Sequence, residues 1–219
     1  MAERIRDFID SESRLIEAVD SAVRYINAGE VIIVATESGY AYLANAFDTK
    51  AVKSIHVMRG DSEGIAAQVF IKGIEVLAGI AHPINSQQKQ VLEKFWPGQL
   101  SVTIKSQPGL NWNLGDDRRL GKINVRIPNR NFISKVLDKT GPLATASIAF
   151  TGRAAINDLS QIIIREGDVG AVFDEGILEN AGHSTIVEFS ENEITLQREG
   201  AVSILQLQPL IPSISPTNL

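Results

Sequence analysis

The 219-residue chain contains no cysteine, which excludes disulfides, thiolate nucleophiles and zinc sites built on cysteine. Aromatic residues make up only 6% of it, so the core must be built mainly from Ile, Val, Leu and Ala. The longest apolar run near the N-terminus, residues 31–35, is far too short to cross a bilayer. The first residues, MAERIRDFIDSES, are charged and lack the apolar centre of a signal peptide. Together these features predict a soluble cytoplasmic protein that makes no contact with a membrane.

Several sequence motifs of known chemistry are also missing. The chain has neither GxxxxGK[ST] nor GxGxxG, so no standard phosphate-binding loop is present. Its three histidines are isolated and show no metal-ligand spacing; His56 lies in a helical pattern and His82 precedes a proline. We therefore predict no metal site made by the protein and no Ser/His/Asp triad.

Negative charge predominates overall, yet it is unevenly distributed along the chain. The formal net charge is -5, but residues 118–153 hold eight Lys or Arg and one acid, Asp138. Residues 154–219 hold two basic residues and ten acidic ones. A basic block in an acidic protein is typical of a site for an anionic ligand, and this one is small enough for a nucleotide.

The hydrophobic pattern alternates between helical and strand spacing. We predict helices at 11–28, 48–58, 74–80, 86–95, 131–138 and 158–165, strands at 30–35, 68–71, 100–104, 123–127, 143–147 and 170–173, and a hairpin formed by 185–189 and 194–197. Residues 106–121 carry Gly, Pro and Asn without a period and are predicted to form a loop. This order predicts one α/β domain with a mixed sheet, followed by a loosely ordered tail.

Small hydroxyl side chains, glycines and arginines follow several of these strands, where open α/β sheets bind ligands. They lie in the segments VATESGY (34–40), VMRG (57–60), WPGQL (96–100), VRIP (125–128), ATASIAFTG (144–152), STIV (184–187) and REG (198–200). Each segment also has a purely structural interpretation, such as a turn or a helix end. Arg126 is the exception. Burying a charge inside a strand costs roughly several kcal/mol of folding free energy unless the charge is paired or faces a ligand.

Taken in order, these segments resemble the YrdC-like threonylcarbamoyl-AMP synthases over residues 11–203, with 204–219 left as a tail. The resemblance implies a YrdC-like, twisted open mixed sheet flanked by helices in a single domain. It also implies a nucleotidyltransferase that makes threonylcarbamoyl-AMP from L-threonine, bicarbonate and ATP for the threonylcarbamoyladenosine modification of tRNA. Mg²⁺ is expected to arrive with the ATP.

The resemblance assigns functional residues position by position. The catalytic pair is Arg59 and Ser147, and the substrate-binding set is Thr36, Tyr40, Gln68, Arg126, Ser184 and Arg198. Arg126 matches the VRIP arginine that binds the threonine carboxylate in this family. Arg198 matches a late arginine near the nucleotide.

Five positions depart from the family pattern. Val57 stands where the family has the lysine of K-x-R, and Ala149 replaces the asparagine of S-x-N. Ala35 replaces a proline, Gly60 another proline, and Gln68 a histidine. Loss of a lysine beside phosphates removes a contact worth roughly a few kcal/mol, or a rate factor of about a hundred.

Three interpretations remain open at this point. The chain is a divergent synthase in which His56, Lys53 or a residue of the 118–122 loop replaces the lysine. Alternatively, it is a non-catalytic paralogue that binds a nucleotide, threonine or a protein of the tRNA-modification machinery. The third alternative is an RNA-binding module that uses the basic block against phosphates.

Overall fold

A computed structural model describes residues 2–117, 119, 121–165, 167–191 and 193–214. The described strands are β1 (Glu3–Ile5), β2 (Ile32–Thr36), β3 (Gly39–Asn45), β4 (Gln68–Phe70), β5 (Leu100–Lys105), β6 (Lys122–Arg126), β7 (Leu143–Ser147), β8 (Ala171–Phe173), β9 (Thr185–Phe189) and β10 (Ile194–Arg198). The described α-helices are α1 (Glu12–Asn27), α2 (Thr49–Arg59), α3 (Leu77–Ile80), α4 (Ser86–Phe95), α5 (Asn131–Thr140) and α6 (Ile204–Leu207). Short 3-10 turns occupy Ile74–Val76 and Leu159–Gln161.

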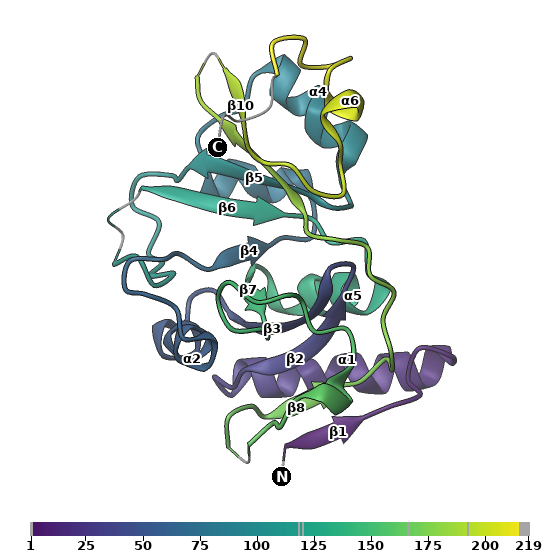
Figure 1. The fold of residues 1–219 in the computed structure, drawn as a ribbon. Helices are drawn as coiled ribbons and strands as arrows, with labels where there is room; N and C mark the ends of the chain where they lie inside the picture. The colour runs from purple at the N-terminus through teal and green to yellow at the C-terminus, as the bar shows by residue number, and fades with distance from the viewer. Residues whose placement is uncertain (1, 118, 120, 166, 192, 215–219) are drawn as a thin grey trace.

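These strands form one mixed sheet with the order β1-β8-β2-β3-β7-β4-β6-β5-β9-β10. Figure 1 shows them stacked from β1 near the N-terminus to β10 at the opposite end. Four pairs are parallel (β1/β8, β2/β8, β4/β6 and β5/β9) and the other five are antiparallel. The predicted α/β domain with an open mixed sheet flanked by helices is confirmed.

Two apolar layers cover the sheet, and they differ in extent. On one face α1 and α5 pack over the β8-β2-β3 end, where Phe8, Phe132 and Phe173 form an aromatic cluster. On the other face α2, α3, α4 and α6 contribute to a larger core. The first layer ends near β4, so the rest of that face is left without a helical cover.

Side-chain alternation along the uncovered strands explains the polar character of this face. In β5 and β6, Val102 and Val125 point into the large core, while the intervening Ser101 and Asn124 lie on the opposite face. Successive side chains of a strand point to opposite sides of a sheet, so polar residues at every second position collect on one face. A polar floor between the two ends of the sheet is the result.

The structure differs from the predicted elements in three places. A helix was predicted at 158–165, but only the turn Leu159–Gln161 forms there, because the run of Ile162, Ile163 and Ile164 disfavours a helix. Strand β3 was not predicted; Thr36 pairs with Gly39, so Glu37 and Ser38 make a tight turn of the kind that joins antiparallel strands. Strand β1 was also missed.

The predicted loose tail at 204–219 is wrong for its first part. Residues 204–207 form α6, and Leu207, Ile211 and Ile214 are buried against the large core. The apolar spacing of these three residues outweighs the effect of the prolines between them. Residues 215–219 lie outside the described part of the chain.

Candidate functional site

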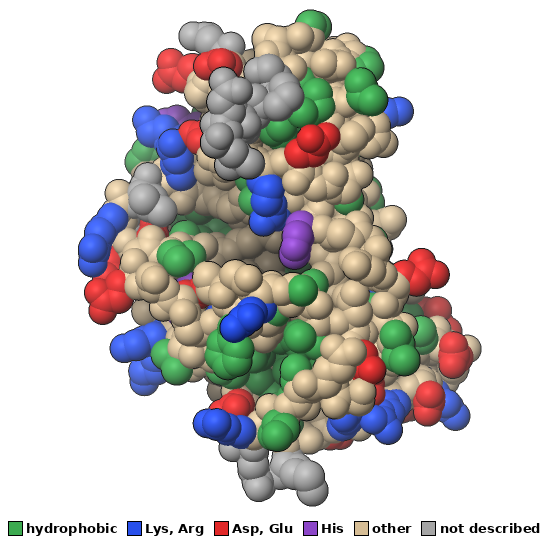
Figure 2. All heavy atoms as spheres, viewed as in Figure 1, with side chains coloured by type: hydrophobic (Ala, Val, Ile, Leu, Met, Phe, Trp, Pro, Cys, Tyr) green, Lys and Arg blue, Asp and Glu red, His purple; other side chains and the backbone are tan. Residues whose placement is uncertain are grey.

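A single cleft of about 680 Å³ opens on the polar face of the sheet. Figure 2 shows a hollow in this side of the molecule, with Lys, Arg and His side chains near its edge. All eight residues assigned to the site from the sequence line the cleft: Thr36, Tyr40, Arg59, Gln68, Arg126, Ser147, Ser184 and Arg198. They come from seven different strands or strand ends and from the end of α2, so the sheet brings together segments that are far apart in the sequence.

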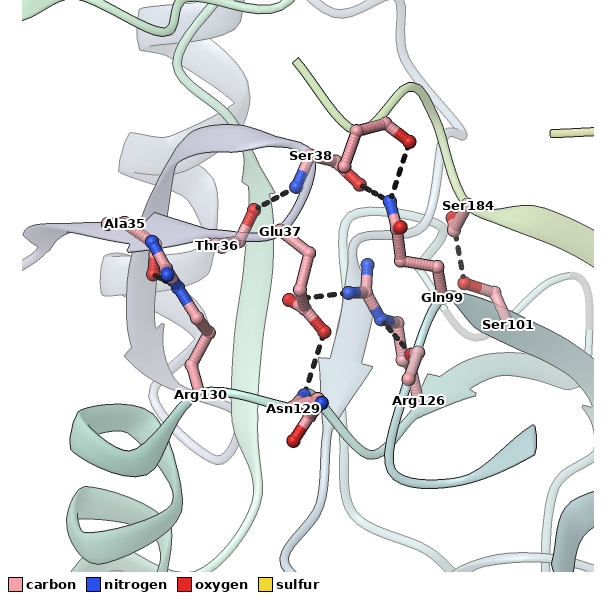
Figure 3. Close-up of polar contacts among 12 residues, drawn as sticks. Ala35, Thr36, Glu37, Ser38, Gln99, Ser101, Arg126, Asn129, Arg130 and Ser184 are labelled. Atoms are coloured by element: carbon pink, nitrogen blue, oxygen red, sulfur yellow. Dashed lines mark hydrogen bonds and ion pairs between the residues drawn. The ribbon is translucent and has the colours of Figure 1, made fainter. Parts of the chain in front are cut away.

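Arg126, at the end of β6, is almost fully buried, with 2% of its surface exposed. One of its terminal nitrogens lies 2.6 Å from a carboxylate oxygen of Glu37, and its Nε donates to the Gly98 carbonyl oxygen at 2.7 Å. The guanidinium also lies over the Phe70 ring, 5.6 Å from its centroid. Figure 3 shows Glu37 reaching from the β2–β3 turn to Arg126 and to the backbone of Asn129. The buried charge of Arg126 is therefore paired with Glu37, and Arg126 still lines the cleft.

The turn after α4 also orients this arginine. The WPGQL segment places the Gly98 carbonyl oxygen against Arg126, while Gln99 Nε2 donates to Ser38 Oγ at 3.0 Å and to the Gly182 oxygen at 3.1 Å. These contacts fit a structural role for WPGQL as the corner between α4 and β5. The corner links the Arg126 strand to the β2–β3 turn on the other side of the cleft.

A chain of polar side chains crosses the cleft floor from β4 to β10. Gln68 Nε2 donates to Ser101 Oγ at 2.8 Å and to the Asn124 side-chain oxygen. Ser101 Oγ lies 3.0 Å from Ser184 Oγ, and Arg198 donates to the Ser184 carbonyl oxygen at 2.8 Å. Burial lowers the pKa of Arg198. Asn124 and Ser101 were not singled out from the sequence, although their place on the polar side of alternating strands was a usable signal.

Arg59 is held at the opposite side of the cleft by a compact polar cluster. Its Nε donates to Asp61 at 3.1 Å, and its terminal nitrogens reach the Ser147 carbonyl oxygen and Thr151 Oγ1, each at 3.3 Å. Thr151 Oγ1 also donates to Asp61, and His56 Nδ1 lies 2.8 Å from the same carboxylate. Burial alone would raise the pKa of Asp61, but the hydrogen bonds from Thr151 and His56 and the Arg59 charge lower it.

Two of the predicted residues use their hydroxyl groups within the protein. Thr36 Oγ1 donates to the Gly39 oxygen at 2.6 Å and accepts from Ser38 N at 3.1 Å, which stabilises the turn. The Tyr40 hydroxyl lies 2.7 Å from the Gly176 oxygen and 3.1 Å from Asp174 Oδ1. Both residues line the cleft, and their hydroxyls are already engaged in hydrogen bonds within the protein.

Asp174 links Tyr40 to the N-terminal strand. Arg4 and Arg6 lie 2.9 and 2.8 Å from its carboxylate. Burial alone would raise the pKa of Asp174, but hydrogen bonds from the Gly176 amide, Arg6 and Tyr40 hold it below its usual 3.8. A carboxylate with a depressed pKa stabilises the fold fully above that usual value, and the contribution is lost as the pH falls through the folded-state pKa.

Asp174→Asn is therefore expected to lower the free energy of unfolding at pH 7 by about 2 kcal/mol, because four donors lose an ionised acceptor. The difference from the wild type should shrink below pH 3.8, where the wild-type carboxylate is protonated as well. Urea unfolding at pH 7 and near pH 3 measures both values. Asp138→Asn, at an exposed pair with Lys72, is the control and should change stability by less than about 0.5 kcal/mol.

The basic block of the sequence is largely neutralised in the fold. Six of its cations pair with acidic residues: Arg119 with Asp117, Lys122 with Glu188, Arg126 with Glu37, Arg130 with Glu175, Lys135 with Glu12, and Lys139 with Asp20. Arg118 lies outside the described residues. Arg153 lines the cleft, and no acidic residue in the described part of the chain pairs with it. The block is thus no continuous basic surface, which counts against the RNA-binding alternative.

The cleft nevertheless has an excess of positive charge. Arg59, Arg126, Arg153 and Arg198 line it together with His56 and His183. Arg59 is paired with Asp61 and Arg126 with Glu37, so the excess charge comes from Arg153 and Arg198, for which the described residues show no acidic partner. Such a balance suits a ligand that carries several negative charges.

Comparisons with known proteins agree with this arrangement. Residues 24–200 match the profile of the Sua5/YciO/YrdC family, whose description is "Telomere recombination". A candidate threonylcarbamoyl-AMP synthase from Mycobacterium tuberculosis is 30% identical over 198 residues, which cover 90% of each chain. The chain belongs to the Sua5/YciO/YrdC family.

Two solved structures of this family share the fold. Pyrococcus abyssi Sua5, crystallised with L-threonine, superposes with a TM-score of 0.84 at 22% identity over 99% of this chain. The chain spans about 63% of the length of that protein. Escherichia coli YciO gives a TM-score of 0.79 at 20% identity, covering 96% of this chain and 99% of the YciO chain.

The two main departures from the Sua5/YciO/YrdC pattern lie in different surroundings. Ala149 lines the cleft and places a methyl group there. Val57 is 71% exposed on α2 and lines a neighbouring hollow instead of the cleft. Position 149 therefore lacks a polar side chain inside the cleft, whereas position 57 lies at the margin of the cleft.

Of the residues considered as replacements for the lysine, His56 lines the cleft and Lys53 lines the neighbouring hollow. Both ring nitrogens of His56 are already engaged, Nδ1 with Asp61 and Nε2 with the Leu114 oxygen at 2.7 Å. In the 118–122 loop, Arg119 and Lys122 are paired with acids, and residues 118 and 120 are outside the described part. Arg153 was missed from the sequence, although its position just after the ATASIAFTG segment pointed to the cleft.

The described residues contain no cluster of three or more His, Cys, Asp or Glu that could hold a metal ion. Among these residues no helix is long and apolar enough to span a membrane.

Proposed function

We propose that this protein is an L-threonylcarbamoyladenylate synthase that makes threonylcarbamoyl-AMP from L-threonine, bicarbonate and ATP. Its product would serve the threonylcarbamoyladenosine modification of tRNA. The observation that carries the proposal is the gathering of four arginines in one cleft, where two described carboxylates, Asp61 and Glu37, pair with Arg59 and Arg126. A carboxylate, a bicarbonate and a triphosphate are all anions, and such a site must hold them close together.

The reaction can be divided between the two sides of the cleft. In the first step the threonine amine attacks bicarbonate, and a carbamate and water are formed. In the second step a carbamate oxygen attacks the α-phosphorus of ATP, and pyrophosphate leaves. We assign Arg126 to the threonine carboxylate, and Arg59, Arg153 and Arg198, which line the same cleft, to the phosphate oxygens.

Preorganisation supports this division of roles. Three hydrogen bonds fix Arg59 before any ligand binds, so its charge needs little rearrangement when the phosphorus centre becomes more negative. Mg²⁺ would come with the ATP as part of the substrate and neutralise its phosphate oxygens.

The direct test is the release of pyrophosphate from ATP in the presence of Mg²⁺. We expect release that requires both L-threonine and bicarbonate and that falls to the enzyme-free rate when either is omitted. Arg165→Ala, an exposed arginine that does not line the cleft, should leave the rate unchanged.

A non-catalytic paralogue is the second candidate, and the methyl group of Ala149 inside the cleft favours it. In that case isothermal titration would detect binding of L-threonine, ATP or both, while no threonine-dependent pyrophosphate appeared. RNA binding that weakens steeply with added salt would instead support the third alternative.

A further inference from the structure

Thr145 is a buried threonine on the floor of the cleft whose hydroxyl group has no partner. It lies on β7 between β3 and β4, opposite Leu43 on one side and Gln68 on the other. It is 2% exposed, lines the cleft, and its Oγ1 makes no hydrogen bond with any described residue. A buried hydroxyl without a partner destabilises a protein, and native structures rarely keep one without a function.

Thr185, the first residue of β9, shows how the same fold treats a threonine that serves structure alone. It is fully buried, and its Oγ1 donates to the Val202 oxygen at 2.6 Å. The same oxygen accepts from the amides of Gly200 and Val202 at 2.9 and 3.0 Å. The contrast between the two buried threonines marks Thr145 as a group that awaits an external partner.

The surroundings of Thr145 define the chemistry of that partner. Its two strand neighbours, Leu43 and Gln68, are uncharged, so neither of them offers a counter-ion to a phosphate or an ammonium group. Gln68 uses its side-chain nitrogen on Ser101 and Asn124, away from Thr145. A hydroxyl group can both donate and accept, so a small neutral group such as another hydroxyl matches the site.

The position of Thr145 relative to Arg126 indicates which ligand brings that group. Only β4 separates the two strands: Phe70 pairs with Arg126 on one side, and Gln68 pairs with Thr145 on the other. Neighbouring strands lie about 4.8 Å apart, so Arg126 and Thr145 are separated by two such spacings and by the two-residue offset between Phe70 and Gln68 along β4. The Arg126 guanidinium lies over Phe70, which shortens this gap to one that a small amino acid can bridge.

We propose that Thr145 reads the side-chain hydroxyl of the amino-acid substrate and thereby selects L-threonine over its isostere L-valine. This inference rests on the proposed function, in which Arg126 binds the carboxylate of the same molecule. A site that hydrogen-bonds a substrate hydroxyl discriminates strongly against an analogue that lacks it.

The test compares Thr145→Val with Thr185→Val by isothermal titration and thermal unfolding of the whole chain. The wild type should bind L-threonine at least tenfold more tightly than L-valine. In Thr145→Val we expect L-threonine to bind about tenfold more weakly, with affinities for L-valine and ATP unchanged. Without ligand, Thr145→Val should raise the melting temperature by about 2 °C, whereas Thr185→Val should lower it.

The outcomes separate this inference from the proposed function. If the wild type binds no L-threonine, the proposed function fails and this inference fails with it. If the wild type binds L-threonine and Thr145→Val binds it equally well, only the role of Thr145 is overturned. The same conclusion follows if Thr145→Val weakens ATP binding instead, or if it lowers the melting temperature of the ligand-free protein.

Discussion

Arg126→Met is expected to abolish detectable L-threonine binding and to lower the free energy of unfolding by about 3 kcal/mol. The loss of binding follows from the removal of the cation proposed to hold the substrate carboxylate. The loss of stability has a separate cause: Glu37, 2.6 Å from Arg126 in the wild type, would be left with its charge largely buried. Isothermal titration and urea unfolding measure the two effects separately.

A second substitution distinguishes the two effects of removing Arg126. Adding Glu37→Gln to Arg126→Met removes the orphaned charge, and the Gln side-chain oxygen can still accept from Asn129 N. We expect the double variant to recover most of the lost stability without recovering L-threonine binding. Recovery of both would show that Arg126 serves the fold alone, and recovery of neither would show that the ion pair is not the source of the instability.

Arg59→Ala is expected to reduce the rate of pyrophosphate release by about a hundredfold, mainly through kcat. The wild-type guanidinium is fixed by Asp61, Ser147 and Thr151, so its charge is already in place when the α-phosphorus is attacked. Arg59→Lys keeps the charge but loses the planar fork that makes these bonds, so an intermediate loss of about tenfold is expected.

Initial rates at varied ATP and L-threonine concentrations separate kcat from KM for these variants. Arg165→Ala is the matched control, since this arginine is exposed and lies outside the cleft. A rise in the KM for ATP at constant kcat would contradict a role in the reaction itself and would leave Arg59 a role in ground-state binding.

Much of the fold was predictable because local patterns agreed with the final packing. In β5 and β6, alternating Val102 and Val125 with Ser101 and Asn124 already mark one buried and one polar face. Strand β3 was not predictable in this way, because its residues are buried on both faces and so lack alternation. The helix predicted at 158–165 failed because its apolar residues do not share one helical face: Ile162 and Ile164 pack against the core, whereas Ile163 between them is 91% exposed.

The resemblance read from the order of the motifs assigned eight residues, and all eight are among those that line the cleft. It did not reveal which atoms of these residues are free to meet a ligand. The hydroxyl of Tyr40 is bound to Gly176 and Asp174. The hydroxyl of Thr145, which lies in the segment 144–152 but was not assigned to the site, has no partner among the described residues. Hydrogen bonds between strands distant in sequence decide this, and no local pattern records them.

The basic block shows most clearly which properties the sequence determines and which the fold determines. The sequence by itself determined the α/β class, the family resemblance and the concentration of Lys and Arg at 118–153. Only the tertiary structure decided which of these charges remain available. Lys135, Lys139 and Arg126 meet Glu12, Asp20 and Glu37, acids that lie about a hundred residues earlier in the chain. Because ion pairing depends on distance in space, the fold neutralises most of the block and leaves Arg153 in the cleft without an acidic partner among the described residues.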